Sequence, residues 1–241
     1  MRYFRGPAQR IGWLFVVATV AGVSSVLVLS STLGDDDLLS TVSSNQGSLI
    51  LGEMLIFLML TAMVGTAVLL SPILKTDSEQ LALSYVLART LEVTIIAIGL
   101  VAGLLLVPLS WEFATAESAD MASASVLAES LKTTSDWTGY LGAQMVFSLS
   151  ALVLNLAFYR NRLIPRWLSV WGLIGVPPMF ASGLLVMFES LNSNSTTINL
   201  LVVPLAVQEM VMAGWMIVKG FRNVDQQDTG SAAIDRMTSQ A

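Results

Sequence analysis

The sequence predicts an all-α membrane protein built as a bundle of six transmembrane helices. Hydrophobic residues make up 54% of its 241 residues and charged residues only 12%, which excludes a soluble globular protein. Six apolar segments are each about 20 residues or longer, as a hydrocarbon core of about 30 Å requires of a helix. These segments lack the alternation of membrane barrel strands, and a helix satisfies its own backbone groups in lipid.

The expected spans form one domain, residues 1–222, and cover residues 11–31, 47–71, 81–108, 137–159, 165–188 and 198–219. The first span follows Arg2 and Arg5, as the apolar part of a secretory signal peptide would. Its apolar run is longer than such a segment usually is, and no Ala-x-Ala pattern precedes Asp35, so we expect it to stay in the protein. A short polar connection around Lys75 separates the second span from the third.

The connection between the third and fourth spans, residues 109–136, is longer than an ordinary loop. Residues 119–133 within it are rich in helix formers, with Val126, Leu127 and Leu131 on one side. We expect a short helix that lies on the outer membrane surface. It would act either as a lid over a cavity or as a stiff connector.

The fourth span, residues 137–159, leads through a tight turn into the fifth. Pro165 suits the first position of the fifth helix. Pro177 and Pro178 in the fifth span and Pro204 in the sixth predict kinks. After the sixth span the chain becomes polar, and residues 223–241 are expected to form a cytoplasmic tail.

The basic residues predict the orientation in the membrane. Ten of the twelve lie at the termini or in the second and fourth connections: Arg2, Arg5, Arg10, Lys75, Arg160, Arg162, Arg166, Lys219, Arg222 and Arg236. Arg89 lies inside a span, and Lys132 is on the opposite side. The positive-inside rule therefore puts both termini in the cytoplasm, in agreement with an even number of spans.

Five of these basic residues are expected to gather where the fourth, fifth and sixth spans reach the inner membrane surface. One interpretation is a contact site for anionic lipid headgroups. The alternative is that they only follow the positive-inside rule. The five residues are Arg160, Arg162, Arg166, Lys219 and Arg222.

Four ionisable residues lie inside the spans: Glu53 in the second, Arg89 and Glu92 in the third, and Glu209 in the sixth. Each costs at least about 2.5 to 3.5 kcal/mol at the bilayer centre, so such residues usually face the bundle interior and find partners. A helix rise of about 1.5 Å per residue puts Glu92 and Glu209 roughly 15 Å deep and Glu53 roughly 9 Å deep. We expect all four to form one interior cluster, with Gln208 as a neighbouring amide.

The charges of this cluster do not balance. One arginine against three glutamates leaves −2, so at least one glutamate is expected to be protonated or a cation to be bound. This favours a site that binds or transports a small solute or a proton. The alternative is a structural or partner-interaction protein in which an ion pair of Arg89 with Glu92 or Glu209 only holds the third and sixth spans together.

Catalysis ranks below both alternatives because the sequence contains no histidine and no cysteine, which removes the commonest general base, the commonest metal ligands and thiolate chemistry. A mechanism with carboxylates alone stays open. No catalytic residue, metal or cofactor is therefore assigned. The expected partners are membrane lipids and a small solute or proton; nucleic acid is not expected, because the acidic residues gather mainly on the outer side and the basic ones on the inner side.

Three stretches of the chain are distinctive: residues 88–92 in the third span, 162–172 entering the fifth, and 208–210 with 215 and 218–221 in the sixth. Together they resemble the bacterial membrane-protein family catalogued as domain of unknown function 4386. The resemblance covers nearly the whole chain, and it implies a six-span protein of a prokaryotic cytoplasmic membrane. The recurring polar positions of that family look like Glu53, Arg89, Glu92, Arg166 and Glu209 here. The resemblance implies no cofactor and no substrate.

Overall fold

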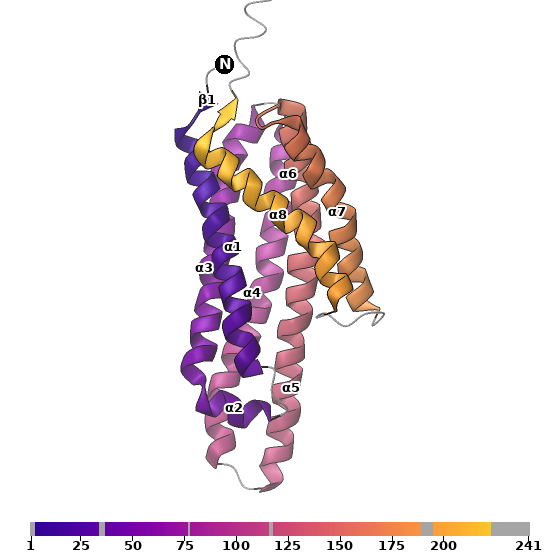
Figure 1. Cartoon of the computed structure of the whole chain (residues 1–241). Coiled ribbons are helices and arrows are strands. Elements are labelled where there is room, and N and C mark those ends of the chain that lie inside the picture. Colours follow the sequence, from indigo (N-terminus) through magenta and orange to yellow (C-terminus); the bar gives the residue numbers. More distant parts are fainter. Residues whose placement is uncertain (1–2, 34–36, 77, 116–117, 189–194, 223–241) are drawn as a thin grey trace, which may run out of the picture.

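The structure is a computed structural model that describes residues 3–33, 37–76, 78–115, 118–188 and 195–222. The expected tail, residues 223–241, lies outside the described residues. Six helical segments are long and apolar enough to cross a membrane, which confirms the predicted all-α fold with six candidate spans. They form an elongated bundle in which α8 crosses the other helices obliquely (Figure 1).

The helices begin and end as follows: α1 at Gly6–Leu33, α2 at Leu38–Ser44, α3 at Gln46–Lys75, α4 at Glu79–Thr115, α5 at Ser118–Tyr140, α6 at Phe147–Asn161, α7 at Arg166–Met187 and α8 at Thr196–Val218. A π-helical segment, η1 at Leu141–Val146, joins α5 to α6 without a break. Two strands of two residues each, β1 at Tyr3–Phe4 and β2 at Phe221–Arg222, complete the described elements.

The two strands bring the ends of the described chain together. β1 and β2 pair antiparallel, with Tyr3 opposite Arg222. The backbone N–H of Arg222 also donates to the carbonyl of Leu163 at 3.0 Å, so β2 lies against the turn between α6 and α7. We call this the strand end of the bundle. Both described chain ends therefore lie at the same end, as an even number of spans requires.

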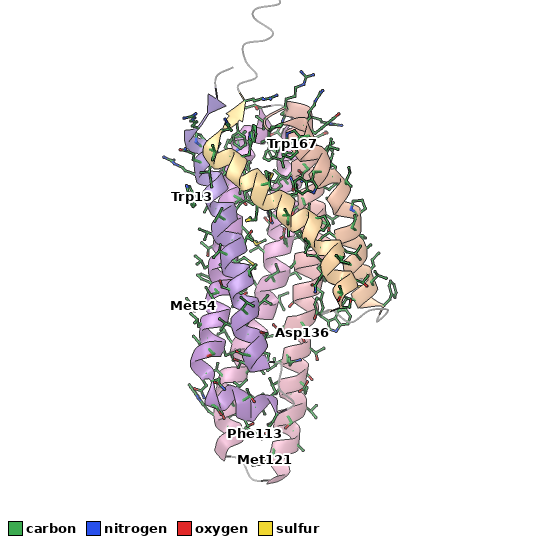
Figure 2. The ribbon with its side chains drawn as sticks, in the orientation of Figure 1. Trp13, Met54, Phe113, Met121, Asp136 and Trp167 are labelled. Atoms are coloured by element: carbon green, nitrogen blue, oxygen red, sulfur yellow. The ribbon has the colours of Figure 1, made fainter. Side chains whose placement is uncertain are left out.

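The stretch between the third and fourth spans differs from the expectation of a loop with a short surface helix. α4 continues to Thr115 and α5 begins at Ser118, so the two helices form a long hairpin. Residues 119–133 are helical, as their composition indicates, and they belong to α5, which packs along α4. In Figure 1 this hairpin extends past the ends of α7 and α8, and Phe113 and Met121 lie near its tip in Figure 2.

Part of α5 packs against protein, although Val126 and Leu127 are more than half exposed. Ala128 of α5 belongs to a buried cluster with Leu106 and Leu109 of α4 and with Leu38 and Leu39 of α2. Burial of Ala128 against α2 and α4 stabilises the position of α5 alongside α4. At about 1.5 Å per residue, the 37 residues of α4 are longer than a hydrocarbon core requires.

The bundle interior and its outer surface are both apolar. At the strand end, Phe15, Tyr85 and Phe158 are fully or almost fully buried in a core that α1, α3, α4, α6, α7 and α8 share. On the outside, Trp13 and Met54 are more than half exposed and point away from the bundle (Figure 2). Such a surface fits lipid, because large apolar patches are rare on soluble monomers.

Candidate functional site

Helix α4 places three polar side chains on one buried face. Tyr85, Arg89 and Glu92 follow one another at intervals of four and three residues, which puts them on the same side of a helix. All three are almost completely buried. The third span therefore carries its charged pair into the interior of the bundle, as the sequence predicts.

The guanidinium of Arg89 makes its shortest contacts within α4. Nη1 donates to both carboxylate oxygens of Glu92 at 3.0 Å, and Nε donates to the hydroxyl of Tyr85 at 3.4 Å. The Tyr85 hydroxyl in turn lies 3.5 Å from the hydroxyl of Thr66 in α3. The charge of Arg89 is thus balanced locally, and the network reaches α3 only through two hydroxyl groups.

Aromatic rings from three helices surround this guanidinium. Its central carbon lies 5.9 Å from the ring centre of Phe15 in α1, 5.8 Å from that of Tyr85 in α4 and 5.6 Å from that of Phe147 in α6. A cation at this distance from a ring face is attracted by the ring quadrupole. The rings also exclude water, so the ion pair lies in an apolar environment that strengthens its attraction.

Helix α6 supplies a second partner to Glu92. The hydroxyl of Ser150 donates to Glu92 Oε2 at 2.8 Å. Just before α6, the π-helical segment η1 brings Gly142 against Ile96 of α4, where a Cβ would lie only 3.5 Å from the carbonyl oxygen of Glu92. Because a π-turn adds a residue to the helical repeat, it changes which residues of α6 face α4, and such turns are frequent at functional sites.

Glu209 of α8 is the third charged member of the cluster and its most weakly held one. Its Oε1 lies 3.8 Å from Nη2 of Arg89, compared with 3.0 Å for the pair of Arg89 and Glu92. The Glu209 side chain is also 17% exposed, whereas that of Glu92 is 2% exposed. Three of the four predicted charged residues, Arg89, Glu92 and Glu209, therefore come together.

The structure does not bring Glu53 into this cluster. Glu53 packs against Gly103 of α4, 14 residues beyond Arg89 and therefore about 21 Å away along the helix axis. The expectation of one cluster with four members is corrected to a cluster of three. The depths estimated from the sequence allowed Glu53 to contact Arg89. The antiparallel packing of α3 on α4 instead places Glu53 beside a part of α4 that is distant from Arg89.

Gln208 also lies outside the charged cluster. Its amide donates to Asn155 Oδ1 in α6 and to the carbonyl of Leu168 in α7, both at 3.1 Å. Adjacent residues do not share a helix face, so Gln208 and Glu209 point to different neighbours. Asn155 also donates to the carbonyl of Ala151 at 2.9 Å, which completes a buried amide network between α6, α7 and α8.

Several residues of the site could not be recognised from the sequence. Ser150, Phe147, Phe15 and Thr66 are small or aromatic residues within apolar runs, where they are indistinguishable from packing residues. Tyr85 could have been found, since it lies four residues before Arg89 on the same face of a helix.

A groove of about 610 Å³ between α3 and α4 reaches this region from the side of the bundle. Its walls are mostly apolar, with Val64 and Val68 from α3 and Val93 from α4. Arg89 is among its lining residues, and Lys75 lies at the α3 end nearest the strands. The groove therefore reaches the charged cluster from the outer surface of the bundle at Arg89.

The five basic residues expected to contact lipid lie at the strand end. The hydrogen bond from Arg222 to Leu163 brings the end of α8 to the turn between α6 and α7. Arg166 lies over the ring of Tyr159, 5.1 Å from its centre. All are exposed except Arg222, which is partly buried: Arg160, Arg162, Arg166, Lys219 and Arg222.

In the ranges that the structure describes, no three acidic side chains come close enough to hold a metal ion. Comparison with curated proteins and with solved structures gave no match. The model of one protein family, described as "Domain of unknown function (DUF4386)", matches residues 11–220, which is most of the chain.

Proposed function

The chain belongs to the DUF4386 family, and we propose that this multi-pass membrane protein binds or transports a proton or small solute at the cluster of Arg89, Glu92 and Glu209. The observation that carries the proposal is the unequal pairing of the two glutamates. Arg89 lies 3.0 Å from Glu92 but 3.8 Å from the more exposed Glu209. Glu209 is therefore the member that can exchange a proton or contact a solute.

Charge balance supports this assignment. With both glutamates ionised, the cluster carries −1, which a buried site of low dielectric does not hold easily. Glu92 already accepts from Arg89 and Ser150, so its charge is stabilised by two donors. A proton or a solute cation at Glu209 would make the cluster neutral. Release and uptake at Glu209 is the type of step that intramembrane carboxylates perform in proton relays.

The alternative is a cluster that only holds helices together. Ser150 and Glu92 favour this alternative, because their hydrogen bond of 2.8 Å links α6 to α4. However, the shorter of the two ion pairs in the cluster joins two residues of α4 and fixes no pair of helices. The link between α4 and α8 is the long one of 3.8 Å. If the cluster only held the third and sixth spans together, the short ion pair would be expected between α4 and α8 and the long one within α4.

The test compares Glu209→Gln with the wild type in purified protein reconstituted into liposomes that contain a pH-sensitive dye. Proton uptake or release is expected in the wild-type protein and lost in Glu209→Gln, while the unfolding temperature of that variant stays close to that of the wild type. Glu129→Gln, which removes an exposed carboxylate from α5, is the matched control and is expected to keep proton exchange. If Glu209→Gln lowers the unfolding temperature and leaves proton exchange intact, the cluster is structural.

We also propose a membrane location and lipid contacts for the protein. The prokaryotic cytoplasmic membrane is the proposed location, with both termini in the cytoplasm, because the basic residues gather at the strand end. Arg160, Arg162, Arg166, Lys219 and Arg222 would contact anionic lipid headgroups there. Their exposure and their shared position at one end support this contact.

A further inference from the structure

Glu53 is the most isolated charged residue in the interior of the described bundle. It lies in α3, about seven residues and thus roughly 10 Å from the start of that helix. Only 1% of the residue is exposed, and neither carboxyl oxygen has a hydrogen-bond partner. Among the ion pairs of the described residues, none includes Glu53. Buried polar groups in proteins are nearly always paired, so this exception needs a physical reason.

No described residue donates a hydrogen bond to Glu53, and none forms an ion pair with it. Its carboxyl group lies against Gly103 of α4, where a Cβ would overlap Oε1 and lie 2.7 Å from Cδ. On α5, Lys132 is already paired with Asp136 at 3.4 Å. Glycine at position 103 thus makes room for the carboxyl group but gives it no partner.

An ionised carboxylate is not stable in this place. Taking a carboxylate out of water without a partner costs several kcal/mol, whereas the neutral acid carries no net charge and costs far less. A metal ion would need several oxygen ligands, and Gly103, against which the carboxyl group lies, supplies no side-chain oxygen. A proton is the cation that fits this site.

We propose that Glu53 is a second proton-binding site, which holds its proton while α3 and α4 are in contact at Gly103 and releases it only when they separate there. Ionised Glu53 would need water, and water reaches it only if the carboxyl group leaves the surface of Gly103. Protonation of Glu53 therefore keeps α3 and α4 in contact at Gly103.

This site is separate from the cluster of Arg89, Glu92 and Glu209. On α3, Glu53 lies 13 residues from Thr66, the residue that reaches Tyr85, which corresponds to about 20 Å along the helix. The inference does not rest on the proposed function. It depends only on whether the carboxyl group of Glu53 is protonated, and not on whether Glu209 exchanges a proton.

The experiment uses the full chain in lipid nanodiscs and a hydrophobic carbodiimide, dicyclohexylcarbodiimide, which reacts with protonated carboxyl groups. The acid proton moves to a carbodiimide nitrogen while a carboxyl oxygen bonds to the central carbon. Rearrangement then gives an N-acylurea that retains all atoms of both reactants. Peptide mass spectrometry assigns the adduct to a residue, so that reaction at Glu53 and reaction at Glu209 are counted separately.

The expected result is an adduct on Glu53 with the hydrophobic reagent and none with a water-soluble carbodiimide. Glu53→Gln is expected to lose this adduct and also the infrared band of a protonated carboxyl group. Gly103→Ala should lose most of the adduct, since the added methyl group displaces the carboxyl group from its place. Gly139→Ala is the matched control, because a Cβ there has no atom within 4 Å, and it should label as the wild type does.

Three results would overturn the inference. An unlabelled Glu53 in folded wild-type protein, combined with an infrared spectrum that Glu53→Gln leaves unchanged, would mean that the residue is ionised. Protection of Glu53 by sodium ions at constant pH would identify a metal-cation site. Equal labelling by the water-soluble reagent would mean that the site is open to water. Because Glu53→Gln keeps the shape of the side chain, the infrared test remains decisive even if Gly103→Ala does not fold.

Discussion

At the scale of single residues, Arg89 is held by groups that differ in strength. Glu92 takes the bidentate contact, Tyr85 accepts one hydrogen bond, and three aromatic rings surround the guanidinium. Glu209 adds only a distant charge. Arg89 is therefore fixed mainly by Glu92, Tyr85 and the rings, and only weakly by Glu209.

Ser150→Ala tests how much of this fixation comes from α6. Ser150 donates to the buried carboxylate of Glu92 at 2.8 Å, and hydrogen bonds to charged groups contribute about 1.5 to 3 kcal/mol. We expect a loss of unfolding free energy of that size, measured by circular dichroism during denaturation in detergent. In the double mutant with Glu92→Gln, the loss caused by Ser150→Ala should become much smaller.

The matched control for this prediction is Ser125→Ala on α5. Both hydroxyl groups also donate to a carbonyl of their own helix, Ser150 to Phe147 and Ser125 to Met121. Only Ser150 has the additional contact with a carboxylate. Equal effects of the two substitutions would mean that Glu92 does not depend on Ser150.

At the scale of helices, α8 is held by amides more firmly than by charges. Gln208 bonds to both α6 and α7 at 3.1 Å, whereas Glu209 reaches α4 only at 3.8 Å. Gly172 of α7 permits this arrangement, because a Cβ there would overlap the Asn155 amide. The charge staple between the third and sixth spans was one alternative from the sequence; in the structure the shorter polar contacts of α8 are those of Gln208.

Gln208→Leu tests this view of α8. The substitution leaves the buried oxygen of Asn155 without its donor, which costs about 1 to 3 kcal/mol. We expect a lower unfolding temperature than in the wild type, and partial recovery when Asn155→Leu is added, because the second substitution removes the unpaired partner. Gln80→Leu at the exposed start of α4 is the control and should change little. An unchanged unfolding temperature for Gln208→Leu would show that the amide network does not position α8.

At the scale of the whole molecule, the pairing of β1 with β2 places both described chain ends at one end of the bundle, and the hairpin of α4 and α5 extends from the other (Figure 1). The basic residues lie mostly at the strand end. The positive-inside rule then predicts that this end faces the cytoplasm and that the hairpin lies outside.

Single cysteines can check this orientation without interference, because the sequence contains no cysteine. Ser125→Cys in the hairpin should react with a membrane-impermeant maleimide in intact cells. Lys219→Cys at the strand end should react only after the membrane is permeabilised. Both positions are exposed, so a difference in labelling reports the side of the membrane and not the burial of the cysteine. The reverse labelling pattern would place the termini outside.

The order of residues along the chain was enough to predict the six spans and the position of Arg89 and Glu92 on one buried face. Both depend on local rules: the length of an apolar run fixes a span, and a spacing of three residues fixes a shared helix face. The resemblance of its motifs to the DUF4386 family is likewise confirmed by the match over residues 11–220.

The neighbours of each helix, and its height and rotation against them, could not be predicted and come from the packed bundle. It brought Ser150 and Phe147 to the charged pair through the π-turn of η1, turned Gln208 away from Glu209 and packed α5 against α2 and α4. It also placed Glu53 beside Gly103, far from Arg89. Helix rotation and offset result from the packing of all side chains at once, and no local spacing encodes them.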